Sequence, residues 1–391
     1  MASEMPRPLE TSSRRSEFPA GAALLLVIAG LLGCLAIYNA QVFTSDPGGY
    51  VLRQMLWLGA GTVLFLTAAA VPFRFYRKAA FPAMLGCLAG LTAVLFTASP
   101  VNGMHGWLSI GSFSFQPSEL AKTGFLLYLC VRCGPRRETG ALDWLKLFPL
   151  LLLTAGLVMA EPDFGSAVMF FVIFLLVSVI SGTKLPYLLI GLGSLAAAGI
   201  FFVLTREYAL GRIIGFLNSG EAGANTWHLR QFQYTMAHGG WLGADWGNAL
   251  WSGTFLPLAP TDSLFASIVE STGCLGGLLV IGGFLLTGGA FCVLSWRVRG
   301  DNNDRRYFIF CAGTVCLIQA LIHISVNCVM IPATGITLPV LSYGGSSLCS
   351  VMLTFGIAFS AARSDEPETV RTLSHTADEA PRTDPAERRL M

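Results

Sequence analysis

The chain has 391 residues, of which 53% are hydrophobic and only 12% are charged, and its mean hydropathy is +0.62. Soluble domains usually carry about 25% charged residues, so this composition excludes a soluble globular protein and predicts an integral membrane protein. The net charge of +2 is too small to suggest that the chain binds nucleic acid.

Charged residues are concentrated near the two ends of the chain, in residues 1–17 and 363–391. Polar segments of this kind cannot bury enough apolar surface to fold, so we predict a polar tail at the N-terminal end and a disordered tail at the C-terminal end. The first apolar run is longer than the apolar part of a signal peptide and should remain as a membrane span. Residues 18–362 then form one polytopic membrane domain.

The spans follow from the gaps between charged residues, because a spanning helix needs about 20 mainly apolar residues. Only nine residues separate Lys122 from Arg132, which is too few to cross a bilayer. A fourth helix must therefore begin near Pro117, a residue suited to a first helical turn. The predicted spans are residues 18–37, 54–73 and 79–98, a fourth from about 117, and then 144–160, 164–183, 185–205, 263–294, 307–330 and 336–362. The predicted fold is all-α, with about ten transmembrane helices and a large outer loop, about residues 205–262, between the seventh and the eighth.

Lys and Arg in short loops predict the orientation, because such residues stay on the cytoplasmic side. With the N-terminus inside, three basic clusters all lie in the cytoplasm. They are Arg74, Arg77 and Lys78; Arg132, Arg136 and Arg137; and Arg297, Arg299, Arg305 and Arg306. The same orientation places residues 99–116, 161–163, 205–262 and 331–335 on the outer face. We therefore expect both termini in the cytoplasm and the unusual polar motifs on the opposite side.

Two polar features lie near the predicted fourth and sixth helices. Glu119 and Lys122 are three residues apart on one helix face, close enough to pair. A structural salt bridge would explain them, but ionisable groups at membrane depth usually face a cavity or a functional path. In the turn EPDFGSA, residues 161–167, a helix cap is a sufficient explanation of Asp163.

Asp262 lies in FLPLAPTDSLFASIVE, residues 255–270, where a polar loop returns to apolar sequence. Its carboxylate is either a helix cap, which accepts hydrogen bonds from the first amides, or a catalytic group. The glycines and tryptophans of the preceding loop predict a structured lid against the membrane interface. Further along, Pro332, Gly335 and Pro339 break the chain, which at membrane depth requires burial or a cavity.

The sequence does not favour a protein-only metal site. Cys130 and Cys133 form one CxxC without a second pair at zinc-site spacing. His228 and His238 are interpreted as interfacial or capping residues, because no carboxylate or cysteine completes a ligand set at a useful spacing.

Six motifs in order resemble those of the shape, elongation, division and sporulation (SEDS) family of cell-wall polymerases, the FtsW and RodA type. They are YVLRQMLWLGAG, VNGMHGWLSIGSFSFQPSELAK, EPDFGSA, RIIGFLN, GNAL followed by FLPLAPTD, and PATGITLPVLSYGGSS. The resemblance covers roughly residues 18–362 and implies ten spans in the bacterial inner membrane. Thr337 in TGITLP and the spacing from GNAL to FLP look more like the division type, FtsW.

The resemblance implies that the protein polymerises lipid II into glycan strands on the outer face during cell division or elongation, releasing undecaprenyl diphosphate. Asp262 matches the functionally important acid of the family and is expected to be the general base. Glu119 and Lys122 match the QPSE glutamate and the lysine after it. The motifs also suggest substrate-binding residues: Trp107, Gln116, Ser118, Arg212, Glu270, Ser342, Gly344, Gly345 and Ser346.

The chemistry and the resemblance together suggest cofactors and partners. A diphosphate leaving group needs positive charge, from Lys122, from Arg212 or from a divalent cation such as Mg²⁺ or Mn²⁺. The sequence contains no glycine loop typical of nucleotide sites, so we expect no nucleotide cofactor. The implied partners are lipid II, membrane lipids, a class B penicillin-binding transpeptidase and other division or elongation proteins.

The sequence departs from the family pattern at several positions, which affects the expected substrate contacts and regulation by partners. These positions are Gly106, Trp246, Leu258, Ser263 and Ser271. Two other functions stay open. One is a lipid II flippase in which Glu119, Lys122 and Glu270 line a path across the membrane. The other is a catalytically quiet scaffold that binds the transmembrane helix of a partner.

Overall fold

The computed structural model describes residues 13–44, 46–97, 106–110, 113–134, 141–218, 224–244, 246–298 and 303–363. In these residues the secondary structure is helical apart from one short antiparallel hairpin. In chain order the elements are α1 (Ser13–Ala40), α2 (Pro47–Ala70), α3 (Phe73–Thr97), β1 (Leu108–Ile110), β2 (Phe113–Phe115), α4 (Pro117–Cys133), α5 (Ala141–Ala160), α6 (Phe164–Ile180), α7 (Leu185–Thr205), α8 (Glu207–Leu217), α9 (Ala224–Gly239), α10 (Leu250–Thr254), α11 (Leu264–Trp296), α12 (Asn303–Asn327) and α13 (Gly345–Arg363).

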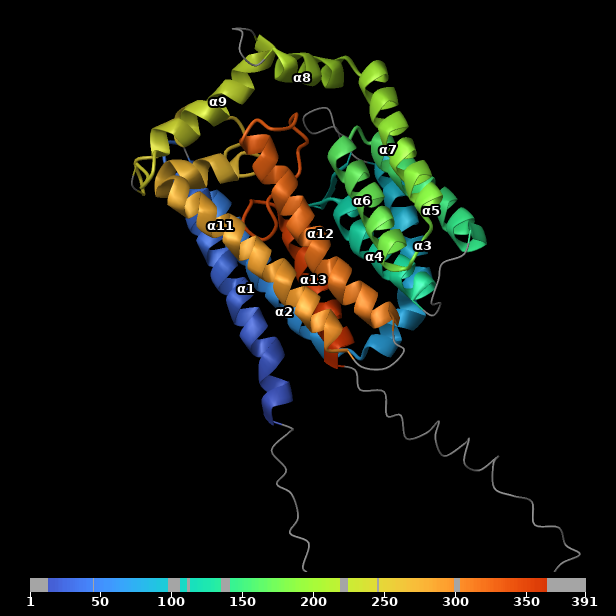
Figure 1. Ribbon diagram of the computed structural model, residues 1–391. Helices are drawn as coiled ribbons and strands as arrows, with labels where there is room; N and C mark the ends of the chain where they lie inside the picture. Colours follow the sequence, from blue (N-terminus) through green and yellow to red (C-terminus); the bar gives the residue numbers. More distant parts are fainter. Residues whose placement is uncertain are drawn as a thin grey trace, which may run out of the picture.

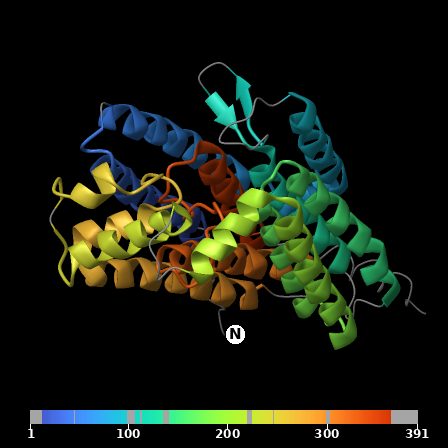
Figure 2. The same cartoon turned by 90° about the horizontal axis from the view of Figure 1, so that it is seen from above.

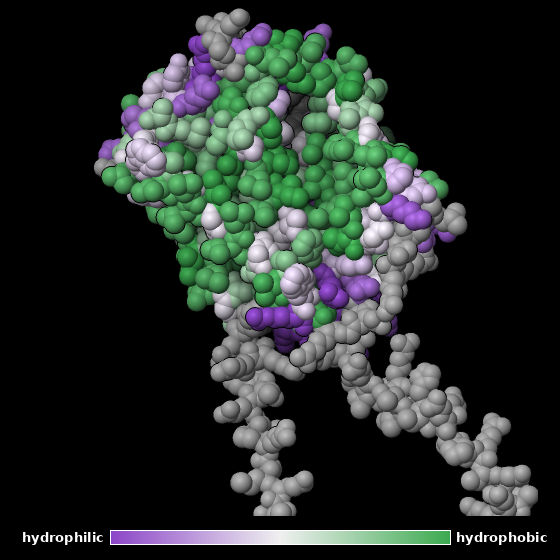
Figure 3. Space-filling model, in the orientation of Figure 1, coloured by the Kyte–Doolittle hydropathy of each residue, from purple (hydrophilic) through white to green (hydrophobic). Residues whose placement is uncertain are grey.

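The predicted membrane fold is confirmed. In the described part of the chain, eight helices are long and apolar enough to cross a membrane: α1, α2, α3, α5, α7, α11, α12 and α13. The helices α4 and α6, with 17 residues each, match the other two predicted spans. Apolar residues cover most of the middle of the face shown in Figure 3, and hydrophilic residues gather toward its two ends. The protein is thus a multi-pass membrane protein, while the count of ten crossings stays a prediction.

The helices form two neighbouring groups (Figures 1 and 2). In one group α13 packs along α2, and α12 packs along α11; the other group contains α3, α4, α5, α6 and α7. The two groups meet at α4, which contacts α3 and α6 on one side and α12 and α13 on the other. The helices α8 and α9 lie across the end of the bundle away from the start of α1 and the end of α13 (Figure 1).

The start of the last helix differs from the prediction. The predicted span 336–362 is wrong at its beginning, because α13 starts at Gly345 and the residues just before it are not helical. Pro339 has no N–H to donate to a helix. Gly335 and Val340 have φ angles of +74° and +65°, outside the right-handed helical region.

Gln54 on α2 holds this non-helical segment, residues 328–344 between α12 and α13. Its Nε2 donates to the carbonyl oxygen of Ser342 at 3.1 Å, and its Oε1 accepts the N–H of Gly344 at 3.3 Å. Directly after the segment, a Cβ on Gly345 would lie 2.1 Å from the Trp57 ring, so only glycine fits against α2 there. A distant helix therefore satisfies the backbone groups that the break leaves without helical partners.

Two stretches that were expected to be loops contain regular structure. The region 205–262 holds α8, α9 and α10, and residues before α4 form the β1–β2 hairpin, in which Leu108 pairs with Phe115. The hairpin was not predicted, since its two strands have three residues each and offer too short a pattern.

The helix α11 is broken at Gly273, where φ is +71°. The turn after α9 packs into this break. The N–H of Cys274 donates to the carbonyl oxygen of Gly240 at 2.9 Å, and a Cβ on Gly273 would lie 2.2 Å from the carbonyl oxygen of Trp241. The region between α9 and α10 is thereby fixed to the first turns of α11.

We expect Gly273→Ala to lower the thermal unfolding temperature of the purified protein in detergent. Both the positive φ and the contact with Trp241 oppose a Cβ, which together should cost about 1–3 kcal/mol. Gly283→Ala on the same helix is the control, because a Cβ there meets no atom within 4 Å. Equal unfolding temperatures for the two variants would contradict this account of the break.

Candidate active site

Asp262 precedes α11 but does not cap it, so the helix-cap interpretation is wrong. Ser263 holds the N-cap position without a capping bond, because its Oγ donates to the carbonyl oxygen of Pro257 at 2.7 Å. The N–H of Ala266 in the first turn instead donates to Oδ1 of Asn327, at the end of α12, at 3.1 Å. The carboxyl group of Asp262 is therefore not engaged by the helix that it precedes.

The environment of Asp262 favours the protonated carboxylic acid at weakly acidic pH. Removal from water raises the pKa of this group to about 6, against the opposing charge of Arg212, and the negative charge of Asp163 adds to the increase. A hydrogen bond from Thr261 lowers the pKa without outweighing these effects. On another side Gly335 leaves room, since a Cβ there would lie 3.9 Å from Oδ2.

Arg212 connects α8 to the non-helical segment and supplies positive charge to the site. Its Nη1 donates to the carbonyl oxygen of Ala333 at 2.9 Å. Burial lowers the pKa of the guanidinium group, whereas Asp262 raises it. An arginine retains its charge under such conditions. The structure thus brings Arg212 and Asp262, both predicted site residues, into one electrostatic cluster.

Asp163 joins the start of α6 to the start of α4. Its Oδ1 accepts the N–H of Ser166 at 2.9 Å, which confirms the predicted helix cap. Its Oδ2 accepts Nε2 of Gln116 at 2.9 Å. Burial raises the pKa of Asp163, the bonds from Ser166 and the charge of Lys122 lower it, and the charge of Glu119 raises it. Asp163 therefore lies within electrostatic reach of both groups on α4.

Glu119 and Lys122 form the predicted pair on α4. The distance from Nζ of Lys122 to Oε1 of Glu119 is 2.9 Å, and their side chains are only 9% and 10% exposed. The backbone of the same turn is tied to α13, because Oγ of Ser350 donates to the carbonyl oxygen of Glu119 at 2.6 Å. The pair is thus buried between α4 and α13.

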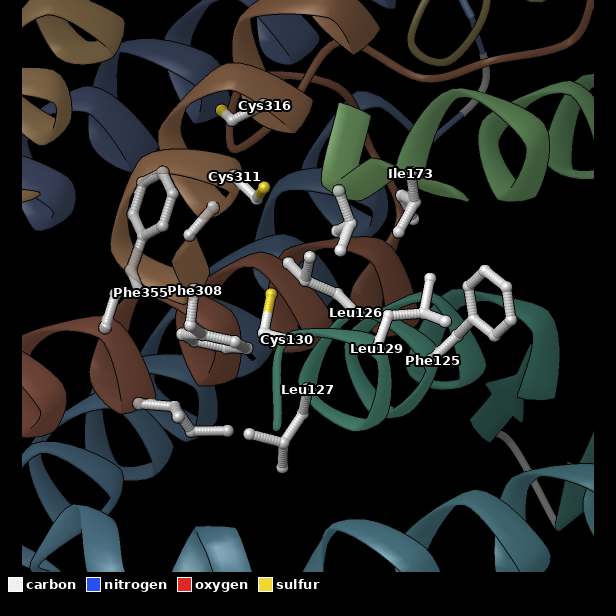
Figure 4. Close-up of a cluster of buried hydrophobic side chains, with 14 of the residues drawn as sticks. Phe125, Leu126, Leu127, Leu129, Cys130, Ile173, Phe308, Cys311, Cys316 and Phe355 are labelled. Atoms are coloured by element: carbon white, nitrogen blue, oxygen red, sulfur yellow. The ribbon is translucent and has the colours of Figure 1, made fainter. Parts of the chain in front are cut away.

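A cavity of about 40 Å³ adjoins this pair and has room for ordered water. Its polar lining includes Gln319 and Thr354, and its apolar lining includes Leu126, Ile173 and Phe355. Figure 4 shows the last three in the hydrophobic cluster where α4, α6, α12 and α13 meet. The ion pair therefore lies at the border between the polar site and the apolar core.

Glu161 is a buried carboxyl group that the sequence reading did not assign to the site. It is fully buried, and neither of its oxygens has a hydrogen-bond partner among the described residues. Burial raises its pKa to about 8, and the charge of Asp163 adds to the effect. Gly106 lies beside it, since a Cβ there would be 3.1 Å from Oε2. The sequence places Glu161 in the EPDFGSA motif beside Asp163, but no local pattern shows that its carboxyl group is buried.

Glu270 serves a different region from Asp262. It is completely buried in α11 and accepts hydrogen bonds from the N–H of Trp251, at 2.9 Å, and from the N–H and Oγ of Ser252. Its Oε1 lies 2.9 Å from Nδ1 of His238. These contacts hold α9 and α10 on α11. A direct role of Glu270 in substrate binding stays a prediction.

The remaining predicted residues lie near the starts of α4 and α13, except Trp107, which precedes β1. Oγ of Ser342 donates to the carbonyl oxygen of Thr261 at 2.8 Å, which links the non-helical segment to the Asp262 turn. The hydroxyls of Ser118 and Ser346 are buried and have no hydrogen-bond partner in the described part of the chain. Trp107 is half-buried before β1.

We expect Lys122→Ala to destabilise the protein by about 3–5 kcal/mol, because it leaves the Glu119 carboxylate buried without its partner. The double variant Glu119→Gln/Lys122→Met should lose less, because no unpaired charge remains. Thermal unfolding in detergent measures both, with Lys146→Ala at an exposed position as the control. An equal loss in the single and double variants would show that the pair is not coupled.

We expect Glu161→Gln to remove part of the dependence of stability on pH. The pKa of Glu161 is about 8 in the folded protein and 4.5 in a free side chain, so the folded state holds the proton more tightly. The contribution of Glu161 to the free energy of unfolding is complete below pH 4.5 and is lost as the pH rises to about 8. The variant should therefore unfold at a more constant temperature between pH 5 and pH 8 than the parent. Parallel profiles for both proteins would contradict an unpaired buried carboxyl group.

Comparisons with known proteins place this chain in a family. A family model of cell cycle proteins that comprises FtsW, RodA and SpoVE matches residues 20–366. A probable peptidoglycan glycosyltransferase FtsW of Coxiella burnetii is 31% identical over 351 residues, covering 86% of this chain and 93% of that protein. One from Marinobacter nauticus is 33% identical over 340 residues, covering 83% of each.

The fold agrees with a solved structure of a peptidoglycan synthase complex that coordinates polymerisation and crosslinking. One chain of that structure superimposes with a TM-score of 0.72 and 26% identity, covering 88% of this chain and 97% of its own length. The family match spans most of the chain and includes each of the polar groups described above. The chain therefore belongs to the FtsW, RodA and SpoVE family of cell cycle proteins, and its curated relatives are of the FtsW type.

Proposed function

We propose that this protein is a membrane-embedded peptidoglycan glycosyltransferase, and that Asp262 is the base that activates the attacking sugar hydroxyl of lipid II. The names of its FtsW relatives support the enzyme class. The single observation that carries the role of Asp262 is its half-buried position beside Arg212, where partial removal from water raises the pKa of the carboxyl group to about 6. A base with a pKa near the working pH transfers protons efficiently.

The proposed step is one displacement at an anomeric carbon. A sugar hydroxyl oxygen forms a bond to that carbon while its proton passes to Asp262. The bond between the carbon and the diphosphate oxygen breaks, and the lipid diphosphate leaves with the electron pair. Asp262 then returns its proton to solvent. Proton transfer to a positioned side chain contributes roughly 10²–10⁴-fold to such rates.

Positive charge for the leaving diphosphate is available from two predicted residues. The charge of Arg212, from α8, acts on Asp262, and the charge of Lys122, from α4, acts on Asp163. The helices α4, α6, α11 and α13 all begin in this region, and helix N-termini favour anions. Ser118 and Ser346, in the first turns of α4 and α13, have unused hydrogen-bonding capacity there. The arrangement suits an anionic, lipid-linked donor.

A divalent cation would add charge neutralisation at the leaving group when bound. Within the described residues no group of three or more His, Cys, Asp or Glu side chains is arranged to hold a metal. Magnesium sites, however, commonly use one or two carboxylates together with substrate phosphates. Asp163 and Asp262 are oxygen ligands of this type, so the residues present are compatible with a cation that arrives with the diphosphate.

The location and the partner belong to the same proposal. The solved peptidoglycan synthase complex supports a class B penicillin-binding transpeptidase as partner of this chain. We place the Asp262 site at the outer face of the bacterial inner membrane, with both chain ends in the cytoplasm. The basic residues near the start of α3 and the end of α11 support this orientation, because they lie at the end of the bundle opposite α8 and α9.

We expect Asp262→Ala and Asp262→Asn to reduce the polymerisation of labelled lipid II by roughly 10²-fold or more, since each removes the base. The parent protein should lose activity about tenfold for each pH unit below the Asp262 pKa of about 6, because only the carboxylate form of Asp262 accepts the proton. Asp46→Asn is the control: Asp46 is an exposed carboxylate that caps α2, a role that asparagine also performs.

Undiminished polymerisation by Asp262→Ala would remove the assigned role. The two other functions would give different results. A flippase would move lipid II across the membrane of vesicles without forming polymer. If the protein is a scaffold, the Asp262→Asn variant would still support the growth of a strain depleted of the parent protein.

A further inference from the structure

Asn327 is the last residue of α12, and both ends of its buried side-chain amide are used. Its Nδ2 donates to the carbonyl oxygen of Asp262 at 3.0 Å and to that of His323 at 2.9 Å. Its Oδ1 accepts the N–H of Ala266 at 3.1 Å. One side chain therefore joins the end of α12 to Asp262 and to the first turn of the helix that follows it.

The acceptor end of this amide takes the place of a local helix cap. The first amides of a helix have no partners within the helix, and a Ser or Asp just before it usually accepts one of them. Ser263 does not, because its hydroxyl binds Pro257. If the Asp262 carboxylate accepted that amide, the bond would stabilise its charged form and weaken it as a base. Asn327 fills the acceptor role and leaves the carboxylate available.

The donor end fixes the peptide group that carries the carboxyl. The Asp262 turn is already held on another side by Ser342, which binds Thr261, and by the N–H of Tyr343, which donates to the carbonyl oxygen of Pro260 at 2.8 Å. Asn327 adds a bond to the peptide of Asp262 itself. Proton transfer requires heavy atoms about 2.6–3.2 Å apart, so a small rotation of this peptide would carry the carboxyl out of range.

We propose that Asn327 is a positioning residue for Asp262. Asn327 caps α11 in place of Asp262 and holds the Asp262 carboxyl group in the site beside Arg212. The proposal rests on the function proposed above and names a residue that acts through Asp262 without touching substrate. Asparagine suits the position because its amide nitrogen donates two hydrogen bonds while its amide oxygen accepts a third. An aspartate would keep the acceptor but place a carboxylate oxygen against two carbonyl oxygens.

The decisive variant is Asn327→Asp, compared with Asn39→Asp. Asn39 is a matched control because it is also buried, at 1% exposure, and also uses both ends of its amide. Its Oδ1 accepts the N–H of Gly247, and its Nδ2 donates to Oγ of Ser271. The two substitutions introduce the same charge at similar burial, but only Asn327 contacts Asp262.

The full-length chain is purified in detergent and assayed with labelled lipid II for kcat, KM and the pH dependence of kcat, with thermal unfolding measured alongside. We expect Asn327→Asp to lower kcat about tenfold or more while KM changes less than about threefold, because the substrate contacts remain. Among the described residues, the charged groups that act on Asp262 are Arg212, from α8, and Asp163, from the turn before α6. A new carboxylate on α12 opposes ionisation, so the acid limb of the profile should move to higher pH. Asn39→Asp should keep the kcat and the profile of the parent.

The positioning role is overturned if Asn327→Asp retains the kcat and the pH profile of the parent, or if Asn39→Asp loses kcat equally. If Asn327→Asp does not fold, Asn327→Ala decides, because it removes both bonds without adding charge; it should lose kcat about tenfold, and a parental value overturns the proposal. Failure of the proposed function looks different: the parent forms no polymer, or Asp262→Asn remains active.

Discussion

The withdrawal of the Asp262 carboxyl group from water is the constraint on which the rest of the site depends. A carboxylate in water has a pKa too low for it to be an effective base near neutral pH. Burial raises this pKa to about 6, and the nearby charge of Arg212 prevents a larger increase. The proposed chemistry therefore needs both surroundings that exclude water and a nearby positive charge. Arg212 on α8 supplies this charge.

Two interruptions in the helices shape the polar regions of the protein. The chain before α13 is not helical, and α11 is broken at Gly273. Each interruption exposes backbone groups that cannot face lipid, and residues distant in sequence satisfy them. Gln54 binds the segment before α13, and Gly240 binds the broken part of α11. The segment before α13 borders the Asp262 turn through Ser342, whereas the break in α11 receives the turn after α9.

Much of the fold could be predicted from the sequence, because it depends on local patterns. The gaps between charged residues predicted the order of the long helices, and the short gap after Lys122 placed Glu119 and Lys122 together on one helix. The cap at Asp163 followed from the turn that contains it. The number of crossings is less certain from pattern, since α4 and α6 are only 17 residues long.

The errors arise where long-range contacts replace local ones. Asp262 has the sequence position of a helix cap, but the cap comes from Asn327, 61 residues away from Ala266. The neighbours of Glu161 include Gly106, which lies far from it in the chain. The prolines indicated a break before the last helix, but the contacts with α2 at its start could not be read from a local pattern. Family resemblance identified Asp262 and Arg212 as important, whereas their mutual arrangement required the three-dimensional structure.

The most direct measurement of the central claim is the ionisation of Asp262 itself. Infrared spectra of the parent minus those of Asp262→Asn, recorded across a pH titration, isolate the carbonyl stretch of the protonated side chain. We expect this band to appear with a midpoint near pH 6, matching the acid limb of polymerisation by the same preparation. A carboxyl group that stays ionised down to about pH 4, as in water, would contradict it.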